Sequence, residues 1–136
     1  MEIIPIVAHR FVKGEDLNHH GTLFAGRTAE WFVEAGLMAA AAYVPSDNIV
    51  LVKLHGMDFV RPVKLGEVAR FVSRIVYAGR TSLIANIQIS VGEERVSNGF
   101  ITYVNVDSEG RKFPHGITIE AIDEDDIELQ LQAKNL

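Results

Sequence analysis

The fold is decided by one stretch near the N-terminus, Leu17-Asn-His-His-Gly-Thr-Leu-Phe-Ala-Gly-Arg27, which runs directly into Thr28-Ala-Glu-Trp-Phe-Val-Glu-Ala-Gly-Leu-Met-Ala-Ala-Ala-Ala-Tyr43. The first part has the glycines and polar residues of a loop, and the second is rich in helix-forming alanine. Backbone N–H groups at the start of a helix have no intrahelical acceptor and carry partial positive charge. This loop and helix start therefore predict a place where a carbonyl oxygen is polarised and an oxyanion is stabilised.

The composition is that of one globular domain. The chain has 136 residues, of which 48% are hydrophobic, enough for a single core but not for two. Its net charge of −5 and its scattered basic residues argue against a nucleic-acid partner or a basic membrane contact. The absence of cysteine excludes disulfides, a thiolate nucleophile and thiolate metal ligands. With no signal-peptide pattern and no apolar run long enough to cross a bilayer, we expect one cytoplasmic domain over residues 1–136.

Residues 25–43 predict a helix that lies flat on a sheet. Positions 29, 33, 36, 37 and 40 recur at helical spacing and form an apolar stripe, whereas Arg27, Glu30 and Glu34 fall on another side. Gly36 in this stripe costs roughly 1 kcal/mol of helix propensity, which predicts a close approach to another backbone. Pro45 and the polar residues after it predict the end of the helix.

The rest of the chain to about Asp107 has the pattern of strands. The apolar segment from Ile3 to Val12 predicts a first strand, and residues 48–60 predict a second. Three long strands then follow in an antiparallel meander, with turns near residues 79–82 and 92–95. The last of these strands is expected to place one set of residues on a single face: Val96, Asn98, Phe100, Thr102, Val104 and Val106. The acidic tail from about residue 120 is left unassigned.

The order of strand, loop, helix and four strands, together with three short motifs, resembles the hotdog-fold acyl-CoA thioesterases of the acyl-CoA hydrolase family. The first motif is Asn18-His-His-Gly-Thr-Leu-Phe-Ala-Gly26, where the family pattern is Asn-x-x-Gly-x-aliphatic-x-Gly-Gly. The others are Met57-Asp-Phe-Val-Arg-Pro-Val63 with Gly66, and Tyr77-Ala-Gly-Arg-Thr-Ser82. The resemblance covers the chain to about Pro114. It implies an α+β hotdog fold, a long central helix wrapped by a five- to six-stranded antiparallel sheet.

The resemblance also implies a catalytic site. The backbone N–H near Ala25 would hold the thioester oxygen, Asn18 would orient the carbonyl or the attacking water, and a helix carboxylate would act as base or nucleophile. The family carries an aspartate at the position of Val33, and the acid in this chain is Glu34, about 100° further round the helix. Glu34 is therefore the candidate acid, reaching toward a partner subunit. A turn-forming Asn18 and an ordinary solvated Glu34 remain alternatives.

A second group of residues is expected to bind the substrate. Arg80, Thr81 and Ser82 combine a guanidinium with hydroxyl and amide donors, which suits the phosphates of coenzyme A, although a plain hairpin turn is also compatible. Arg61 is another candidate for a phosphate contact, with a surface position as the alternative. Gly26, next to Ala25, completes the expected substrate-binding set. No metal and no separate cofactor are expected, because coenzyme A is part of the substrate.

The expected activity is metal-independent hydrolysis of an acyl-CoA thioester by activated water. Two alternatives remain open. One is a hotdog enoyl-CoA hydratase or dehydratase, since His20 and Glu34 have the separation of the dehydratase pair, and the other is a non-catalytic acyl-CoA-binding protein. Because a single sheet of this kind leaves an edge strand open, we expect a homodimer or a higher homo-oligomer, a tetramer or hexamer. The sequence does not indicate the length of the acyl chain.

Overall fold

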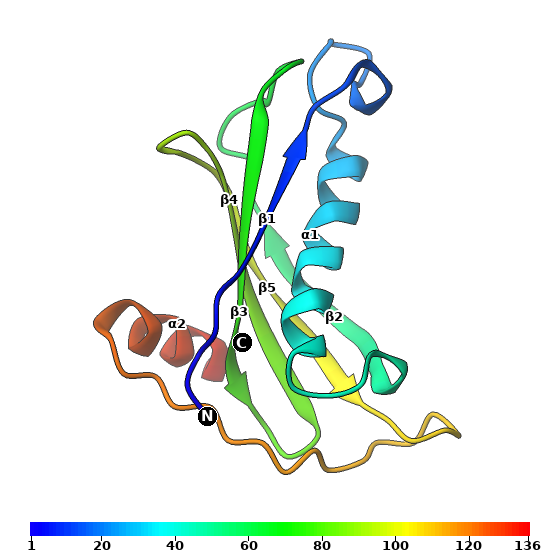
Figure 1. Ribbon diagram of the computed structural model, residues 1–136, viewed down its shortest axis with the longest axis vertical. Helices are drawn as coiled ribbons and strands as arrows, with labels where there is room; N and C mark the ends of the chain where they lie inside the picture. Colours follow the sequence, from blue (N-terminus) through cyan, green and yellow to red (C-terminus); the bar gives the residue numbers. More distant parts are fainter.

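The chain forms one antiparallel sheet with a helix on each face (Figure 1). The computed structural model describes residues 1–136. The elements, in chain order, are β1 (Ile6–Phe11), the 3₁₀ turn η1 (Gly14–Asp16), α1 (Ala25–Ala41), the 3₁₀ turn η2 (Ser46–Asn48), β2 (Ile49–Met57), β3 (Val68–Ala78), β4 (Ser82–Val91), β5 (Glu94–Asn105) and α2 (Glu124–Lys134). The predicted central helix is confirmed as α1, and the unassigned tail contains α2.

The five strands form a single sheet in the order β1-β3-β4-β5-β2, and every neighbouring pair is antiparallel. This arrangement confirms the expected α+β architecture, in which a sheet wraps a long helix. The predicted meander corresponds to β3, β4 and β5, which are joined by short turns. β1 and β2 are the two edges of the sheet, so each has one side without a strand partner.

The helix α1 lies along the sheet and buries one side of its surface. Its buried residues are Thr28, Trp31, Phe32, Ala35, Gly36, Ala39 and Ala40. The predicted apolar stripe is confirmed only in part: Gly36 and Ala40 are buried, and Val33 and Leu37 are partly buried against the core, but the centre of the buried side lies part of a turn away. Val33 is half-buried at the edge of the core. Trp31 and Phe32 decide the orientation, since they are the largest apolar side chains of the helix and gain most from burial.

Gly36 allows α1 to approach a side chain of the sheet closely. A Cβ atom on Gly36 would lie 2.5 Å from the hydroxyl oxygen of Tyr103 and 3.2 Å from Cδ1 of Ile87. The expected close approach is present, but its partner is a side chain and not another backbone. The Tyr103 hydroxyl donates to the backbone carbonyl of Val33 at 2.7 Å, and burial raises the pKa of this phenol. Tyr103 thus fixes where the middle of α1 rests on β5.

One residue of β5 has no partner in the neighbouring strand. The pairing with β4 skips Val96, because Arg95 and Ser97 pair with consecutive residues of β4. Such a β-bulge changes the direction in which the following side chains point. Val96 is 1% exposed and belongs to the core under α1, whereas Phe100 belongs to a separate cluster under α2. The prediction that Val96 shares a face with Phe100 is therefore wrong.

The second helix, α2, covers part of the sheet face opposite α1 (Figure 1). Asp123 caps its first turn, since the carboxylate accepts the backbone N–H of Asp126 at 2.8 Å. Ala133, near the end of the helix, packs in a small cluster with Val76 and Ile84. Neither α1 nor α2 combines the length and the apolar composition that crossing a bilayer requires.

Candidate active site

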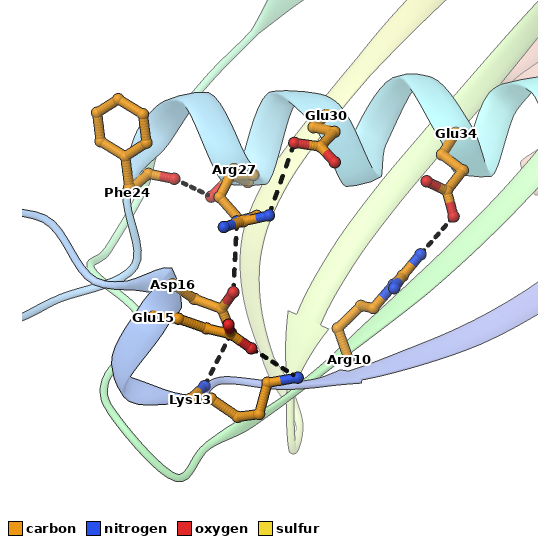
Figure 2. Close-up of polar contacts among 9 residues, drawn as sticks. Arg10, Lys13, Glu15, Asp16, Phe24, Arg27, Glu30 and Glu34 are labelled. Atoms are coloured by element: carbon orange, nitrogen blue, oxygen red, sulfur yellow. Dashed lines mark hydrogen bonds and ion pairs between the residues drawn. The ribbon is translucent and has the colours of Figure 1, made fainter.

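The loop before α1 is held in place by Asp16, which is 4% exposed. Its carboxylate accepts the backbone N–H of Lys13 at 2.9 Å and lies 3.3 Å from Nε of Arg27 in the first turn of α1 (Figure 2). Its backbone carbonyl accepts the N–H of Phe24, the residue just before the helix, at 2.9 Å. Asp16 therefore fixes the direction in which the chain enters α1.

Asn18 closes the same loop with its side-chain amide. The amide oxygen accepts the backbone N–H groups of His20 at 2.8 Å and Thr22 at 3.1 Å, and the nitrogen donates to the Thr22 hydroxyl at 3.1 Å. Such bonds from an asparagine to nearby backbone stabilise a turn. The turn-forming role that the sequence left as an alternative is thus present. Asn18 also lines the cavity beside α1, where it can meet a ligand.

The start of α1 presents backbone N–H groups that have no acceptor. Phe24 makes no side-chain capping bond, and its carbonyl accepts the N–H groups of Arg27 and Thr28 at 2.9 and 3.0 Å. The N–H groups of Ala25 and Gly26 precede the first intrahelical donors and are bonded to nothing in the chain. Ala25 also lines the cavity. The donors that the sequence predicted for an oxyanion are therefore free at this point.

A cavity of about 330 Å³ opens beside the start of α1. Its floor consists of four residues from four different segments, each at most 8% exposed: Leu23, Thr28, Val63 and Val96. The more exposed lining residues form its rim: Asn18, Ala25, Phe59, Val60, Arg61 and Pro62. The polar groups are thus near the mouth, and the floor is largely apolar. A cavity of this kind suits a ligand with a polar head and an apolar tail.

Arg61, at the rim, is held by carboxylates of the same chain. Its two terminal nitrogens donate to the two carboxylate oxygens of Glu67 at 3.0 and 3.1 Å, and its Nε lies 3.1 Å from the carboxylate of Glu94. The hydrogen bonds from Arg61 lower the pKa of Glu67 to about 2, and the pKa of Arg61 is raised in turn. Arg61 already has carboxylate partners, and its predicted contact with a phosphate stays a prediction.

Glu34 lies on the β1 side of α1. Its carboxylate forms an ion pair with Arg10 of β1 (Figure 2). The Arg10 guanidinium also lies 5.4 Å from the centre of a Trp31 ring. Glu34 does not line the cavity. The structure therefore brings Asn18 and Ala25 together at the cavity, but within one protomer it does not bring Glu34 to them. The geometry of one protomer does not test the catalytic role that the sequence predicted for Glu34.

Val33, where the family pattern has an acid, lies on the other side of α1. It is three residues before Gly36, so the two residues share a side of the helix. Gly36 rests against Tyr103 of β5, and β5 is the neighbour of the edge strand β2. Position 33 thus faces the β2 edge of the sheet, whereas Glu34 faces the β1 edge.

The residues predicted to bind phosphate lie at the other end of the sheet. Arg80, Thr81 and Ser82 lie in the turn between β3 and β4 or at its end, and Figure 1 shows this turn at the opposite end of the molecule from the start of α1. β3 has eleven residues and spans about 33 Å. Arg80 is exposed and takes part in none of the ion pairs of the chain. Within one protomer, these residues do not meet Asn18 or Ala25.

Comparison with known proteins identifies the family. The family model described as "Thioesterase superfamily" matches residues 20–97, more than half of the chain. The chain belongs to the thioesterase superfamily. Within the superfamily, it is similar to the acyl-CoA thioester hydrolase YciA of Escherichia coli K12, with 29% identity over 117 residues that cover 77% of this chain and 84% of that protein.

Solved structures of similar proteins share the fold of this thioesterase-superfamily chain. An acyl-CoA hydrolase from Bacillus cereus superposes with a TM-score of 0.89 at 22% identity, covering 96% of this chain and 82% of the other. The hexameric thioesterase y2039 from Yersinia pestis superposes with a TM-score of 0.73 at 26% identity, covering 79% of this chain and 91% of the other. These likenesses confirm the hotdog fold expected from the sequence.

Several cavity residues of this superfamily member were not predicted. Nothing in the sequence around Thr28 distinguishes it from other residues of the helix. The bulge that turns Val96 inward cannot be recognised from the alternation of apolar and polar residues. Val63 could have been predicted, because it is the last residue of the motif from Met57 to Val63. Only Arg61 of that motif was proposed to contact the substrate. No group of three or more His, Asp or Glu side chains in the structure is arranged to hold a metal ion.

Proposed function

We propose that this protein hydrolyses acyl-CoA thioesters to a carboxylic acid and free coenzyme A. Water bonds to the carbonyl carbon, and the carbonyl oxygen becomes an oxyanion. The C–S bond breaks as the carbonyl re-forms, and the departing thiolate takes up the proton that the water loses. Membership of the thioesterase superfamily and the similarity to relatives named acyl-CoA thioester hydrolases support this reaction.

One observation carries the proposal: Ala25, whose N–H is unpaired, lines a cavity that Asn18 also lines, and the neighbouring N–H of Gly26 is unpaired as well. A thioester carbonyl placed at the mouth of this cavity receives donors that are already fixed in direction, with the positive end of the helix dipole behind them. Alanine at position 25 in place of the family's glycine preserves this donor, because the N–H belongs to the backbone. Asn18 orients the carbonyl or the water.

We assign the phosphates of coenzyme A to the turn between β3 and β4. Arg80 supplies an exposed guanidinium without a carboxylate partner, and Thr81 and Ser82 add hydroxyl and backbone donors. Arg61 is a weaker candidate for the same task, since Glu67 already occupies both of its terminal nitrogens. The substrate thus has to meet two groups of residues that one protomer holds at opposite ends.

The edge strand β2 offers a way to bring these two groups together. Its residues Val50, Leu51, Val52 and Leu54 are between 39% and 58% exposed, and an apolar edge of this length is a template for another strand. β2 begins at the end of the sheet that carries the Arg80 turn, since Ile49 pairs with Asn105, whose N–H donates to the Thr81 carbonyl at 2.7 Å. It ends at Met57, close to the segment that lines the cavity.

We propose that β2 pairs antiparallel with β2 of a second copy about a two-fold axis. This pairing places the cavity end of one protomer beside the Arg80 end of the other. Each of the two sites then combines Asn18 and Ala25 of one copy with Arg80 of its partner. The hexameric thioesterase y2039 and a further acyl-CoA thioesterase described as hexameric support an assembly of such dimers.

The attacking water has to lose a proton, and no carboxylate or imidazole lines the cavity of one protomer. Glu34 pairs with Arg10 on the β1 side, away from the edge at which the second copy is proposed to bind. We therefore propose that oxyanion stabilisation and positioning supply most of the rate enhancement, and that Glu34 mainly fixes Arg10. The water then gives its proton to solvent before it attacks as hydroxide, and the thiolate takes up a proton from solvent as it leaves, so the rate rises with pH.

The test is thiol release from purified protein mixed separately with acetyl-, butyryl-, octanoyl-, palmitoyl- and phenylacetyl-CoA. Equal amounts of free thiol and carboxylic acid support hydrolysis. Thermal stabilisation by acyl-CoA without thiol release would instead identify an acyl-CoA-binding protein, and hydration of crotonyl-CoA without thiol release would identify a hydratase. Either of the last two results overturns the proposal.

We propose that the reaction needs neither a metal ion nor a separate cofactor. Turnover should then survive incubation with EDTA followed by dialysis, and restoration by a divalent cation would contradict this part of the proposal. A cytoplasmic location belongs to the same proposal, because the phosphates of acyl-CoA prevent it from crossing a bilayer. Cell fractionation tests the location.

A further inference from the structure

The segment that follows β5 turns back and runs past the turn between β3 and β4 (Figure 1). Asn105, the last residue of β5, anchors this segment. Its side-chain nitrogen donates to the Phe113 carbonyl at 2.9 Å, and its backbone carbonyl accepts the Phe113 N–H at 3.0 Å. Asn105 is 3% exposed, so water does not compete for these bonds. The anchor places His115, two residues after Phe113, against the turn.

His115 binds the turn with both its backbone and its side chain. Its backbone N–H donates to the Arg80 carbonyl at 3.3 Å, and Nε2 of its ring lies 2.9 Å from the Ser82 carbonyl oxygen. The backbone N–H of Ile117 donates to Nδ1 of the same ring at 2.9 Å. A carbonyl oxygen can only accept and a backbone N–H can only donate, so Nδ1 is the acceptor and the ring hydrogen is on Nε2. The imidazole is therefore a donor toward the turn.

The backbone acceptors of the turn are all occupied within the chain. The carbonyls of Arg80 and Ser82 both accept from His115. The Thr81 carbonyl between them accepts the N–H of Asn105 at 2.7 Å. Carbonyl oxygens carry partial negative charge and repel an anion. Their engagement by donors of the chain therefore favours the binding of an anion at this turn.

The donors of the same turn have no acceptor in the chain. The backbone N–H groups of Arg80 and Thr81 and the hydroxyls of Thr81 and Ser82 take part in no hydrogen bond of the chain. The Ser82 hydroxyl lies close to the turn, because a Cβ atom on Gly79 would be 2.5 Å from its Oγ. The Arg80 side chain is exposed. The turn thus offers several free donors and no free backbone acceptor, which suits a phosphate group.

We propose that His115 is a positioning residue for the phosphates of coenzyme A, because its imidazole holds the Ser82 carbonyl and so keeps the turn in the form that binds them. This inference rests on the proposed function, since it takes the turn to be the phosphate site. His115 does not touch the substrate in this scheme, because both of its ring nitrogens are used within the chain. Its removal weakens binding of the nucleotide part and leaves the breaking of the C–S bond unchanged.

The test compares His115→Ala with His115→Gln and with Gln130→Ala. Alanine removes the bond to the Ser82 carbonyl, whereas glutamine has an amide nitrogen that can take the place of Nε2 and should restore binding. Gln130 of α2 is the control, since its side-chain nitrogen also ties two segments together. It donates to the backbone carbonyls of Val76 and Ile119 at 3.0 and 3.1 Å, and its truncation removes these bonds without touching the turn.

Calorimetry measures the dissociation constant of coenzyme A, which requires no turnover. Steady-state kinetics measure kcat and KM for butyryl-CoA and for S-butyryl-N-acetylcysteamine, a thioester without phosphates. His115→Ala should raise the dissociation constant of coenzyme A and the KM of butyryl-CoA about fivefold, the effect of one hydrogen bond, with kcat unchanged. His115→Gln and Gln130→Ala should both stay within about twofold of the wild type. KM for the phosphate-free thioester should be the same in all four proteins.

His115→Asn provides a second variant if His115→Ala folds poorly. The asparagine amide oxygen can still accept the Ile117 N–H, but its side chain is too short to reach the Ser82 carbonyl. It should therefore weaken the binding of coenzyme A as much as alanine does.

The possible failures can be told apart. Weaker coenzyme A binding in His115→Ala, without hydrolysis of any thioester by the wild type, would refute the proposed activity and leave the role of His115 in place. Hydrolysis with unchanged coenzyme A affinity in both His115→Ala and His115→Asn would refute the role of His115 and leave the activity in place. An equal loss of affinity in Gln130→Ala, or a raised KM for the phosphate-free thioester in His115→Ala, would also overturn the inference.

Discussion

The two ends of the sheet carry different chemistry. Where α1 begins, the protein offers unpaired backbone N–H groups and an apolar cavity, and the guanidinium that lines this cavity, that of Arg61, is already bonded to Glu67. At the other end, Arg80 is exposed and has no carboxylate partner. The first end is suited to a carbonyl and its acyl chain, and the second to phosphates. Since β3 alone separates them by about 33 Å, one protomer does not make a complete site.

The largest effect should come from preventing the two ends of different copies from meeting. The double variant Val52→Lys/Leu54→Lys adds two charges to the free edge of β2, and lysine on an edge strand blocks strand pairing. We expect a folded monomer whose thiol release is below about a thousandth of the wild-type rate, because the substrate is no longer held at both points. Analytical ultracentrifugation and the thiol assay measure this. Val7→Lys, at an exposed position of the β1 edge, is the matched control.

Full activity in a monomeric Val52→Lys/Leu54→Lys protein would contradict the composite site. Loss of assembly in Val7→Lys would show instead that the β1 edge carries the contact.

The next largest effect should come from substitutions of Asn18, at the end of the sheet that is proposed to bind the thioester carbonyl. Asn18→Ala removes both the loop bonds and the amide that faces the cavity, and we expect kcat to fall by about a hundredfold, as for the loss of one oxyanion-hole donor. Asn18→Asp keeps the acceptor for the N–H groups of His20 and Thr22 and removes the amide donor, whose loop partner, the Thr22 hydroxyl, can itself donate to the new carboxylate. It should lower kcat to a similar extent while keeping the melting temperature of the wild type.

Equal kcat in the wild type and in Asn18→Asp would reduce Asn18 to a turn residue. The pair of variants thus separates the structural bonds seen in the loop from a role in the reaction.

Substitutions at the end of the sheet that is proposed to bind phosphate should change KM more than kcat. Arg80→Ala removes a charge-assisted contact and should raise KM about tenfold with little change in kcat. Arg70→Ala, another exposed arginine without an ion pair, is the control and should leave KM unchanged. Steady-state kinetics with a short acyl-CoA measure both constants.

Mixing the Asn18→Ala and Arg80→Ala proteins makes the comparison sharper. After unfolding and refolding together, half of the dimers contain one copy of each variant, and in a shared site one of their two active sites has both original residues. Activity at low substrate should then recover to about a quarter of the wild-type value. If each site belonged to a single copy, mixing would restore nothing.

The two sides of α1 provide a further test. Glu34→Gln breaks the ion pair with Arg10 on the β1 side, where no substrate is expected, and should change kcat by less than about threefold. The rate of the wild type should increase with pH without a plateau near neutrality, since no carboxylate base is engaged. A hundredfold fall in kcat for Glu34→Gln would return Glu34 to the role of catalytic base.

The smallest effect concerns the pH dependence of stability at the cavity rim. The pKa of Glu67 is about 2 in the folded protein, chiefly because Arg61 bonds to it, against about 4.3 in an unfolded chain. Its stabilisation is therefore complete above pH 4.3 and is lost as the pH falls toward 2. Glu67→Gln should lose less stability over this range, by up to about 1 kcal/mol, in urea unfolding. Glu15→Gln, in an exposed pair with Lys13, should behave as the wild type.

The sequence predicted those features that depend on local pattern. The loop, the helix start and the free donors at Ala25 follow from the order of glycines, Asn18 and alanines, and the meander follows from alternation along the strands. The centre of the buried side of α1 was misplaced because Ala29, Val33 and Leu37 fit a stripe at helical spacing, whereas Trp31 and Phe32 gain more from burial. The spacing of residues shows which side chains share a side of the helix, but not which of them gain most from burial.

Other features depend on contacts between distant segments. Glu34 has its position because Arg10 lies opposite it on β1, and no pattern within either segment indicates that pairing. The separation of Arg80 from Asn18 follows from the direction of β3, which is fixed only once the sheet is assembled. The motifs identified both groups of residues, but the distance between them is a property of the fold.

Val96 is the unpaired residue of the β-bulge in β5. The size of the cavity therefore depends on the number of residues between β4 and β5 as well as on the side chains that line it. Removing a single amino acid from the turn before Val96 would let β4 and β5 pair without interruption, rotate residue 96 to the solvent side and leave an opening where it stood. Related sequences that are shorter by one residue at this point should therefore accept bulkier substrates, even when every other lining residue is identical.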